Sequence, residues 1–244
     1  MLKIATQNKE LSQAIADVGY FSECPERSDV LWWLDYSSDN KLSLSGKLTD
    51  STFDIFFDFN DPSLMYRLKN GGGRKEPLAK AIGLKGNSCP SVIDATTGMG
   101  RESFLLAHLG CHVTSLERNP VIFSLLNNAL SRYQKQSTLN WSLLNHDSIQ
   151  YLSGLQNESR PDVVYLDPMF PERSKSAAVK KEMRVFKQLA GEDLDADMLL
   201  TAALNAATQR VVVKRPKSAP FLNQQSPSHQ IVSKKHRFDV YLSH

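Results

Sequence analysis

The sequence predicts an α/β protein with a doubly wound, mostly parallel sheet of seven strands that ends in an antiparallel hairpin. From residue 91 onward, short apolar runs alternate with longer amphipathic segments, which is typical of strand–helix units in a parallel sheet. The tail, residues 230–242, carries two strand-like runs with no helix between them, and this predicts the hairpin. We expect a small α+β domain over residues 1–65 and a large domain over residues 66–244.

The small domain begins with a predicted strand over residues 2–5 and a helix over 11–18 that Gly19 closes. Three strand-like runs with partial period-2 alternation follow, and turn residues separate them, so we expect an antiparallel meander. The three runs cover residues 31–36, 41–45 and 52–59.

Three consecutive glycines, residues 71–73, precede a predicted helix that has Pro77 in its first turn. Three cations, Lys69, Arg74 and Lys75, surround these glycines. The segment is either a flexible linker or a backbone nest that holds a phosphate or carboxylate, and the sequence favours neither interpretation.

In the large domain each predicted strand is followed by at least one predicted helix, until the closing hairpin. The expected strands cover residues 91–95, 111–116, 139–144, 163–166 and 210–214. The expected helices cover residues 101–109, 121–132, a short stretch that ends at 155, 176–190 and 195–207.

Composition and charge are those of an ordinary globular protein: 244 residues, 41% hydrophobic, 23% charged and a net charge of +3. No apolar stretch approaches the roughly 20 residues that span a bilayer, and the first residues lack a signal-peptide core. The three cysteines show no C-x-x-C spacing, so we expect neither disulfides nor a metal site. A cytoplasmic protein without a membrane partner is therefore expected, and its oligomeric state is left open.

The predicted strand over residues 163–166 ends in Asp167-Pro168-Met169-Phe170. Pro168 fixes its own φ and keeps Asp167 out of the helical region. A carboxylate and a rigid turn therefore lie at the carboxyl end of a strand, where open α/β sheets bind ligands. An isolated Asp-Pro pair is usually only a turn, so the neighbouring motifs decide its interpretation.

Acidic residues and glycines also follow the other predicted strands. Asp94, Gly98 and Gly100 lie between the first strand and its helix, and Glu117 ends the second strand. Glycines there let a ligand approach the backbone, and a carboxylate after the second strand typically binds a ribose. Asp147 follows the third strand and is either a further ligand contact or a helix N-cap with Ser148.

The third glycine of a dinucleotide fingerprint is absent, since Ser103 holds its place. S-Adenosylmethionine has no pyrophosphate to bind, and it needs polar contacts for its amino acid, its ribose and its adenine. The motifs supply these in chain order, and the chain resembles the Rossmann-like class I S-adenosylmethionine-dependent methyltransferases.

Asp167-Pro-Met-Phe resembles the [Asp/Asn]-Pro-Pro-[Tyr/Phe] motif of enzymes that methylate exocyclic amines of bases, with Met169 in place of the second proline. The amine lone pair is delocalised into the ring, and hydrogen bonds to Asp167 and to the Pro168 carbonyl localise it. Phe170 can stack on the base and hold it in line. We therefore expect Asp167, Pro168 and Phe170 to carry the reaction.

Basic residues favour a nucleic-acid acceptor. One cluster lies between residues 172 and 190, another follows the strand over 210–214, and a third covers residues 234–237. The acidic run over 192–197 is interpreted only as a helix start. The expected RNA contacts are Arg74, Lys175, Lys180, Lys181, Arg184, Lys214 and Arg215.

Longer segments resemble the bacterial RsmJ family, from about residue 66 to the end. They include Asp94-Ala-Thr-Thr-Gly-Met-Gly-Arg-Glu, Leu116-Glu-Arg-Asn-Pro, Val164-Tyr-Leu-Asp-Pro-Met-Phe-Pro and Val211-Val-Val-Lys-Arg-Pro. The resemblance implies S-adenosylmethionine-dependent methylation of N2 of a guanosine in 16S rRNA, with the small ribosomal subunit as partner. It also implies cofactor contacts at Arg101, Glu102, Glu117, Arg118, Ser148 and Asp167.

Three alternatives remain open on the residues alone. The same turn serves adenine N6 in RNA or DNA, because any exocyclic amine presents the same chemistry. An NAD(P)-dependent oxidoreductase would need the third glycine and a positioned proton donor. A non-catalytic RNA-binding module would not need the Asp167 turn.

Overall fold

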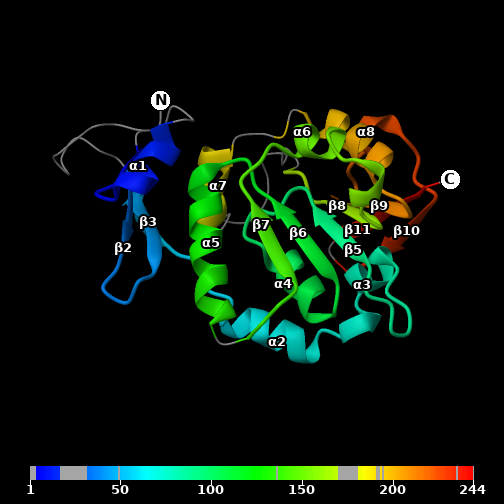
Figure 1. Ribbon diagram of the computed structural model, residues 1–244, viewed down its shortest axis with the longest axis horizontal. Helices are drawn as coiled ribbons and strands as arrows, with labels where there is room; N and C mark the ends of the chain where they lie inside the picture. The colour runs from blue at the N-terminus through cyan, green and yellow to red at the C-terminus, as the bar shows by residue number, and fades with distance from the viewer. Residues whose placement is uncertain are drawn as a thin grey trace. The chain divides into compact units, whose positions relative to one another are not determined.

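The computed structural model describes residues 4–16, 32–48, 50–135, 137–169, 181–190, 193, 195–234 and 236–243 (Figure 1). The chain forms two compact units. The first comprises residues 1–59, 119–137 and 172–191, and the second comprises residues 60–118, 138–171 and 192–244. The expected division into domains at residue 65 stays a prediction.

The second unit is built on a seven-stranded sheet in the order β10-β11-β9-β8-β5-β6-β7. The five strands from β9 to β7 are parallel, and β11 runs antiparallel to both β9 and β10. This confirms the predicted Rossmann-like class, including its terminal hairpin. The strands are β5 (Ser91–Asp94), β6 (His112–Leu116), β7 (Trp141–Leu144), β8 (Val163–Leu166), β9 (Arg210–Pro216), β10 (His229–Val232) and β11 (His236–Leu242).

The strand order places a topological switch point between β5 and β8. From β5 the chain moves outward to β6 and β7, and then returns to place β8 on the other side of β5. Such a switch point, at the carboxyl ends of the strands, is where doubly wound sheets bind ligands.

Register determines which side chains share a face of this sheet. Ile93, Val164 and Val211 are ladder neighbours, and all three belong to the apolar core that α8 (Ala196–Ala206) and α6 (Ser148–Ser153) help to build. Because side chains alternate along a strand, Asp94 and Tyr165 project to the opposite face. The same alternation places Asp167 and Lys214 on that opposite face.

Further helices of this unit are α2 (Pro62–Asn70), α3 (Pro77–Ile82) and α4 (Arg101–His108), and its short 3-10 turns are η2 (Gly73–Lys75), η3 (Asn157–Ser159) and η4 (Leu222–Gln224). Helix α4 contacts β6 and β7, whereas α3 contacts β9 and β11. Helix α2 was not predicted from the sequence. It begins at Pro62, and the Asp61 carboxylate caps it by accepting from the Ser63 and Leu64 amides, at 3.0 Å each.

The first unit contains a four-stranded sheet in the order β1-β2-β3-β4. The predicted meander is confirmed, since β2 (Trp32–Tyr36), β3 (Leu42–Lys47) and β4 (Thr52–Ile55) pair antiparallel, while β1 (Ile4–Ala5) pairs parallel with β2. The last strand is shorter than the predicted 52–59. The unit also holds α1 (Lys9–Ala16), α5 (Pro120–Gln134) and α7 (Lys181–Ala190).

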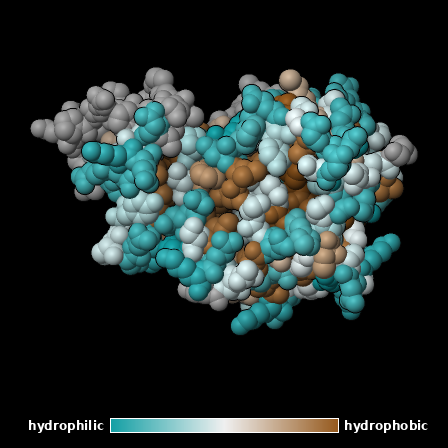
Figure 2. Space-filling view, viewed as in Figure 1, coloured by the Kyte–Doolittle hydropathy of each residue, from teal (hydrophilic) through white to brown (hydrophobic). Residues whose placement is uncertain are grey.

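On the face drawn in Figure 2, hydrophilic residues predominate and hydrophobic residues are exposed in patches. Among the described residues, no helix combines the length and the apolar character needed to cross a membrane.

Candidate active site

The Asp167 turn follows β8, whose four residues are all buried. The Asp167 amide donates to Thr96 Oγ1 at 2.6 Å, so the turn is tied directly to the loop that follows β5. Pro168 is buried, and Met169 is half-buried. Phe170 lies outside the described residues, and so do Lys175 and Lys180. The predicted juxtaposition of the two loops is therefore present, while the stacking role of Phe170 stays a prediction.

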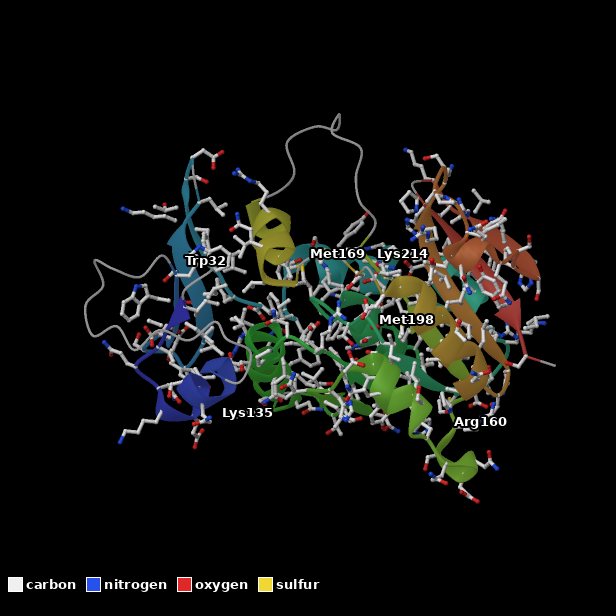
Figure 3. All side chains as sticks on the ribbon, turned by 90° about the horizontal axis from the view of Figure 1, so that it is seen from above. Trp32, Lys135, Arg160, Met169, Met198 and Lys214 are labelled. Atoms are coloured by element: carbon white, nitrogen blue, oxygen red, sulfur yellow. The ribbon has the colours of Figure 1, made fainter. Side chains whose placement is uncertain are left out.

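Asp167 ends a chain of alternating charges. Lys214 Nζ lies 2.6 Å from Asp167 Oδ2 and 3.1 Å from Glu102 Oε1. Figure 3 labels Lys214 and also Met169, which comes two residues after Asp167. The same Glu102 oxygen lies 3.5 Å from Arg67 NH1. Arg67 NH2 in turn lies 2.7 Å from Glu76 Oε1. Three carboxylates thus alternate with two cations, on side chains from α2, α4, β9 and the ends of β8 and η2.

Burial and charge act against each other in this chain. Burial disfavours the charged form of Lys214, yet Asp167 and Glu102 together raise the pKa of Lys214 above its ordinary value. Burial raises the pKa of Asp167. The charge of Lys214 opposes this increase, and the charge of Glu102 adds to it. Burial likewise works against an ionised Glu102, but Lys214 and Arg67 lower the pKa of that carboxyl. Lys214 therefore favours the ionised form of both neighbouring carboxylates.

Asp94 organises the loop after β5 from inside the protein. It is 1% exposed, its Oδ1 accepts the Thr96 amide at 3.2 Å, and its Oδ2 accepts the Ser103 hydroxyl. Ser103 in turn accepts from Ser115 Oγ at 2.8 Å. Burial raises the pKa of Asp94 to about 7. Because both carboxylate oxygens have donors within the fold, the structure accounts for Asp94 as a residue that shapes the loop, and its predicted contact with a cofactor stays a prediction.

The glycines of this loop adopt backbone conformations that side chains disfavour. Gly98 has φ of 52° and Gly100 has φ of 68°. A Cβ built on Gly98 would have no neighbour closer than the Thr96 carbonyl at 4.0 Å, so space is open beside the loop. The Gly98 amide donates to Glu117 Oε2 at 3.1 Å. The structure therefore brings together the glycine turn and the carboxylate that the sequence predicted to share a ligand.

The residues after β6 and β7 reach the same edge of the sheet. Glu117 is 8% exposed and directly follows β6, and its amide donates to the Leu144 carbonyl of β7 at 3.1 Å. Asp147 caps α6 by accepting the Gln150 amide at 2.9 Å, which is the simpler of its two open interpretations. Ser148 Oγ donates to the Ala95 carbonyl at 2.7 Å and so joins the start of α6 to the loop after β5.

The two predicted cofactor-contacting arginines have protein partners. Arg101 NH2 donates to Ser63 Oγ at 2.8 Å and lies 3.3 Å from Asp61 Oδ1, at the start of α2. Arg118 binds two acids that precede α8: its NH1 lies 2.6 Å from Asp195 Oδ2 and its NH2 lies 2.9 Å from Asp193 Oδ1.

Three of the predicted RNA-contacting residues, Arg74, Arg184 and Lys214, have partners within their own unit. Arg74 donates to the carbonyls of Gly86, Ser88 and Leu109, at 3.1, 2.8 and 2.7 Å. Arg215 is 5% exposed. Within the first unit, Arg184 forms two hydrogen bonds with Asp50, at 2.8 and 2.9 Å. Lys214 belongs to the charge chain, and the Lys181 side chain is not among the described ones. Contacts of these residues with RNA stay predictions.

Sequence reasoning missed three residues of the site. Arg67 and Glu76 extend the row of alternating charges that begins at Asp167, and no local sequence pattern predicts them. Asp193 was assigned only to a helix start, but its Oδ2 accepts the Met169 amide at 2.7 Å. One signal in the sequence could have identified Asp193. The acidic run over 192–197 was assigned no partner, and Arg118, next to Glu117, is a cation that could pair with it.

Known proteins of one family resemble this chain over most of its length. Residues 23–243 match a family described as "Putative SAM-dependent methyltransferase". Ribosomal RNA small subunit methyltransferase J of Tolumonas auensis is 52% identical over 192 residues, which are 77% of each chain. The protein of the same name from Cronobacter sakazakii is 48% identical over 225 residues, 86% of this chain and 89% of the relative. The chain belongs to the ribosomal RNA small subunit methyltransferase J family.

A solved structure agrees with this family. The crystal structure of an S-adenosylmethionine-dependent methyltransferase from Neisseria gonorrhoeae superposes with a TM-score of 0.72 at 30% identity, and covers 99% of this chain and 96% of that chain. The chain is therefore an S-adenosylmethionine-dependent methyltransferase. The residues present fit that cofactor: open space lies beside Gly98, and the Glu117 carboxylate lies within hydrogen-bond distance of the Gly98 amide. Within the described ranges, no group of three His, Cys, Asp or Glu side chains could hold a metal ion.

Proposed function

We propose that the protein transfers the methyl group of S-adenosylmethionine to the exocyclic N2 of a guanosine in 16S rRNA. The observation that carries the proposal is the position of Asp167: its carboxylate follows β8, its amide is bonded to Thr96 of the cofactor loop at 2.6 Å, and Lys214 binds its Oδ2. A carboxylate held at the switch point beside the glycine loop is placed to bind an acceptor next to the cofactor.

The cofactor-binding residues are assigned from their places at the edge of the sheet. The loop from Gly98 to Gly100 offers backbone to the amino-acid part, and Glu117 offers carboxylate oxygens to the ribose hydroxyls. Asp147 and Ser148 border the adenine side. When bound, S-adenosylmethionine supplies an electrophilic methyl group on a sulfonium. Three further charged residues lie at this carboxyl edge of the sheet, where their ion pairs keep the neighbouring segments in place: Arg101, Glu102 and Arg118.

The acceptor chemistry follows from Asp167 and Pro168. A guanine N2 amine is a weak nucleophile, because its lone pair is delocalised into the ring. Asp167 accepts a hydrogen bond from one amine proton and the Pro168 carbonyl accepts from the other, so the lone pair is localised on nitrogen. Lys214 holds Asp167 Oδ2, and the structure gives Oδ1 no hydrogen-bond donor among the described residues. We therefore assign Asp167 Oδ1 to the hydrogen bond with the amine.

The choice of guanine N2 in small-subunit rRNA rests on the family and not on the turn. The relatives are named for small-subunit rRNA, and the turn alone would serve adenine N6 equally well. The oxidoreductase alternative is disfavoured by Ser103, which stands where the third glycine of a dinucleotide site would be and is 0% exposed. An rRNA acceptor also implies that the enzyme works in the bacterial cytoplasm.

The test is transfer of labelled methyl from S-adenosylmethionine to 16S rRNA and to small subunits, both prepared from a strain that lacks this gene. Nuclease digestion and mass spectrometry should yield N2-methylguanosine at one position. The Asp167→Ala variant, with unchanged circular dichroism, should give no product. Label in adenine or in DNA would overturn the substrate assignment, and full activity of Asp167→Ala would overturn the mechanism.

A further inference from the structure

The Asp193 carboxylate joins two segments that are far apart in the sequence. Its Oδ2 accepts the Met169 amide at 2.7 Å, in the turn that follows Asp167. Its Oδ1 accepts from Arg118 NH2 at 2.9 Å, just after β6. The Asp193 side chain is 20% exposed. It therefore holds both the turn over residues 167–169, called here the acceptor turn, and the segment next to Glu117, the carboxylate proposed to bind the ribose.

Met169 is the position at which this chain departs from the [Asp/Asn]-Pro-Pro-[Tyr/Phe] motif. A proline there has no amide proton and has a fixed φ, so the turn needs no outside support. Methionine leaves φ free to rotate and adds a half-buried N–H that must find an acceptor. The hydrogen bond to Asp193 satisfies this donor, and it also restrains the backbone at the residue where the proline is missing.

The Met169 amide is firmly restrained, because its acceptor is a carboxylate that an arginine also holds. Hydrogen bonds to carboxylates are shorter and stronger than those between neutral groups. Arg118 fixes the carboxylate from the other side, and Arg118 is anchored by a second acid, since its NH1 lies 2.6 Å from Asp195 Oδ2. The turn is thus attached to a charged cluster and not to a single mobile side chain.

We propose that Asp193 is a positioning residue for the acceptor turn, and that its hydrogen bond to the Met169 amide stands in for the missing second proline. The inference rests on the proposed methyl transfer to an exocyclic amine. Through Met169, Asp193 keeps the Pro168 carbonyl and the Asp167 carboxylate aimed at the two amine protons. Misplacement of such acceptors by about 1 Å lowers the rate of transfer by on the order of 100-fold.

The experiment compares two variants with wild-type enzyme at saturating cofactor and rRNA. Asp193→Ala should lower kcat by about 10- to 100-fold and leave the Kd of S-adenosylmethionine within about twofold. Asp195→Ala is the matched control, because it removes an acid from the same arginine without touching Met169. It should keep kcat within about twofold. Equal losses of kcat in the two variants would show that the effect passes through Arg118, and would overturn the proposal.

A rescue variant separates a positioning role from a folding defect. In the Asp193→Ala background, Met169→Pro removes the unsatisfied N–H and fixes φ. The double variant should therefore have a kcat at least about tenfold higher than that of Asp193→Ala alone. A double variant that folds, by circular dichroism and by cofactor binding, but regains no activity would overturn the proposal. If wild-type enzyme itself makes no N2-methylguanosine, the proposed function fails independently of Asp193.

Discussion

The ammonium group of Lys214 lies 2.6 Å from the Asp167 carboxylate, although 47 residues separate them. The reason is register: Leu166 of β8 pairs with Val213 of β9, and the residues that follow these two, Asp167 and Lys214, project to the same face. Lys214 also lies 3.1 Å from Glu102. A residue that the sequence placed among the RNA contacts is therefore the counter-ion of the candidate catalytic carboxylate.

Lys214→Met should move the acid limb of the kcat profile to higher pH. Burial and Glu102 both raise the pKa of Asp167, and Lys214 opposes them. Without Lys214 that pKa rises further, so the ionised form that accepts the amine proton is lost at a higher pH. The measurement is the pH dependence of initial rates at saturating substrates, and the acid limb should move toward higher pH. Lys214→Arg keeps the charge and should keep the wild-type limb, and an identical profile in both variants would contradict the role of the charge.

Glu117→Gln should weaken binding of S-adenosylmethionine by about 10- to 100-fold, because hydrogen bonds to an ionised acceptor contribute more than those to an amide. Glutamine retains an oxygen for the Gly98 amide, so the loop should stay folded. Calorimetric titration measures the effect. Asp162→Asn is the control, since Asp162 accepts the Ser91 amide at 2.8 Å at the amino end of β5. An equal loss of affinity in both variants would argue against a ribose contact at Glu117.

Asp94→Asn should flatten the dependence of stability on pH. Burial raises the pKa of Asp94 from 3.8 to about 7. Between these values the folded state binds more protons at this site than the unfolded state does, so the contribution of Asp94 to the free energy of unfolding falls as pH rises. Urea denaturation across this range should show a smaller fall for the variant. A variant as pH-sensitive as wild type would show that Asp94 is ionised throughout.

Arg74→Ala should lower the free energy of unfolding by about 1 to 3 kcal/mol, because three backbone carbonyls lose their donor. The exposed neighbour Lys75 is the control, and Lys75→Ala should change stability by less than about 0.5 kcal/mol. Denaturant titration and rRNA binding are measured on the same samples. Unchanged stability with weakened RNA binding would favour the phosphate contact that the sequence predicts.

Local patterns of residues were sufficient to predict the sheet and the edge that carries the site. Glycines after β5 and acids after β6 and β8 are local patterns, and parallel strands always bring their carboxyl ends to one edge. The alternation of apolar strands and amphipathic helices was sufficient for the doubly wound class and its terminal hairpin. Helix α2 was missed because it is only nine residues long and its main signal, the Asp61 cap, is a single residue.

The pairing of the charged side chains, in contrast, is visible only in the packed chain. From their neighbours in the sequence, Lys214 and Arg74 were predicted to contact phosphates. Asp193 was assigned to the start of a helix. Their partners are Asp167, three backbone carbonyls and the Met169 amide, and each partner lies between 12 and 47 residues away. Ion pairs and backbone contacts of this kind depend on strand register and loop path. Those are properties of the packed chain, and no local pattern of residues encodes them.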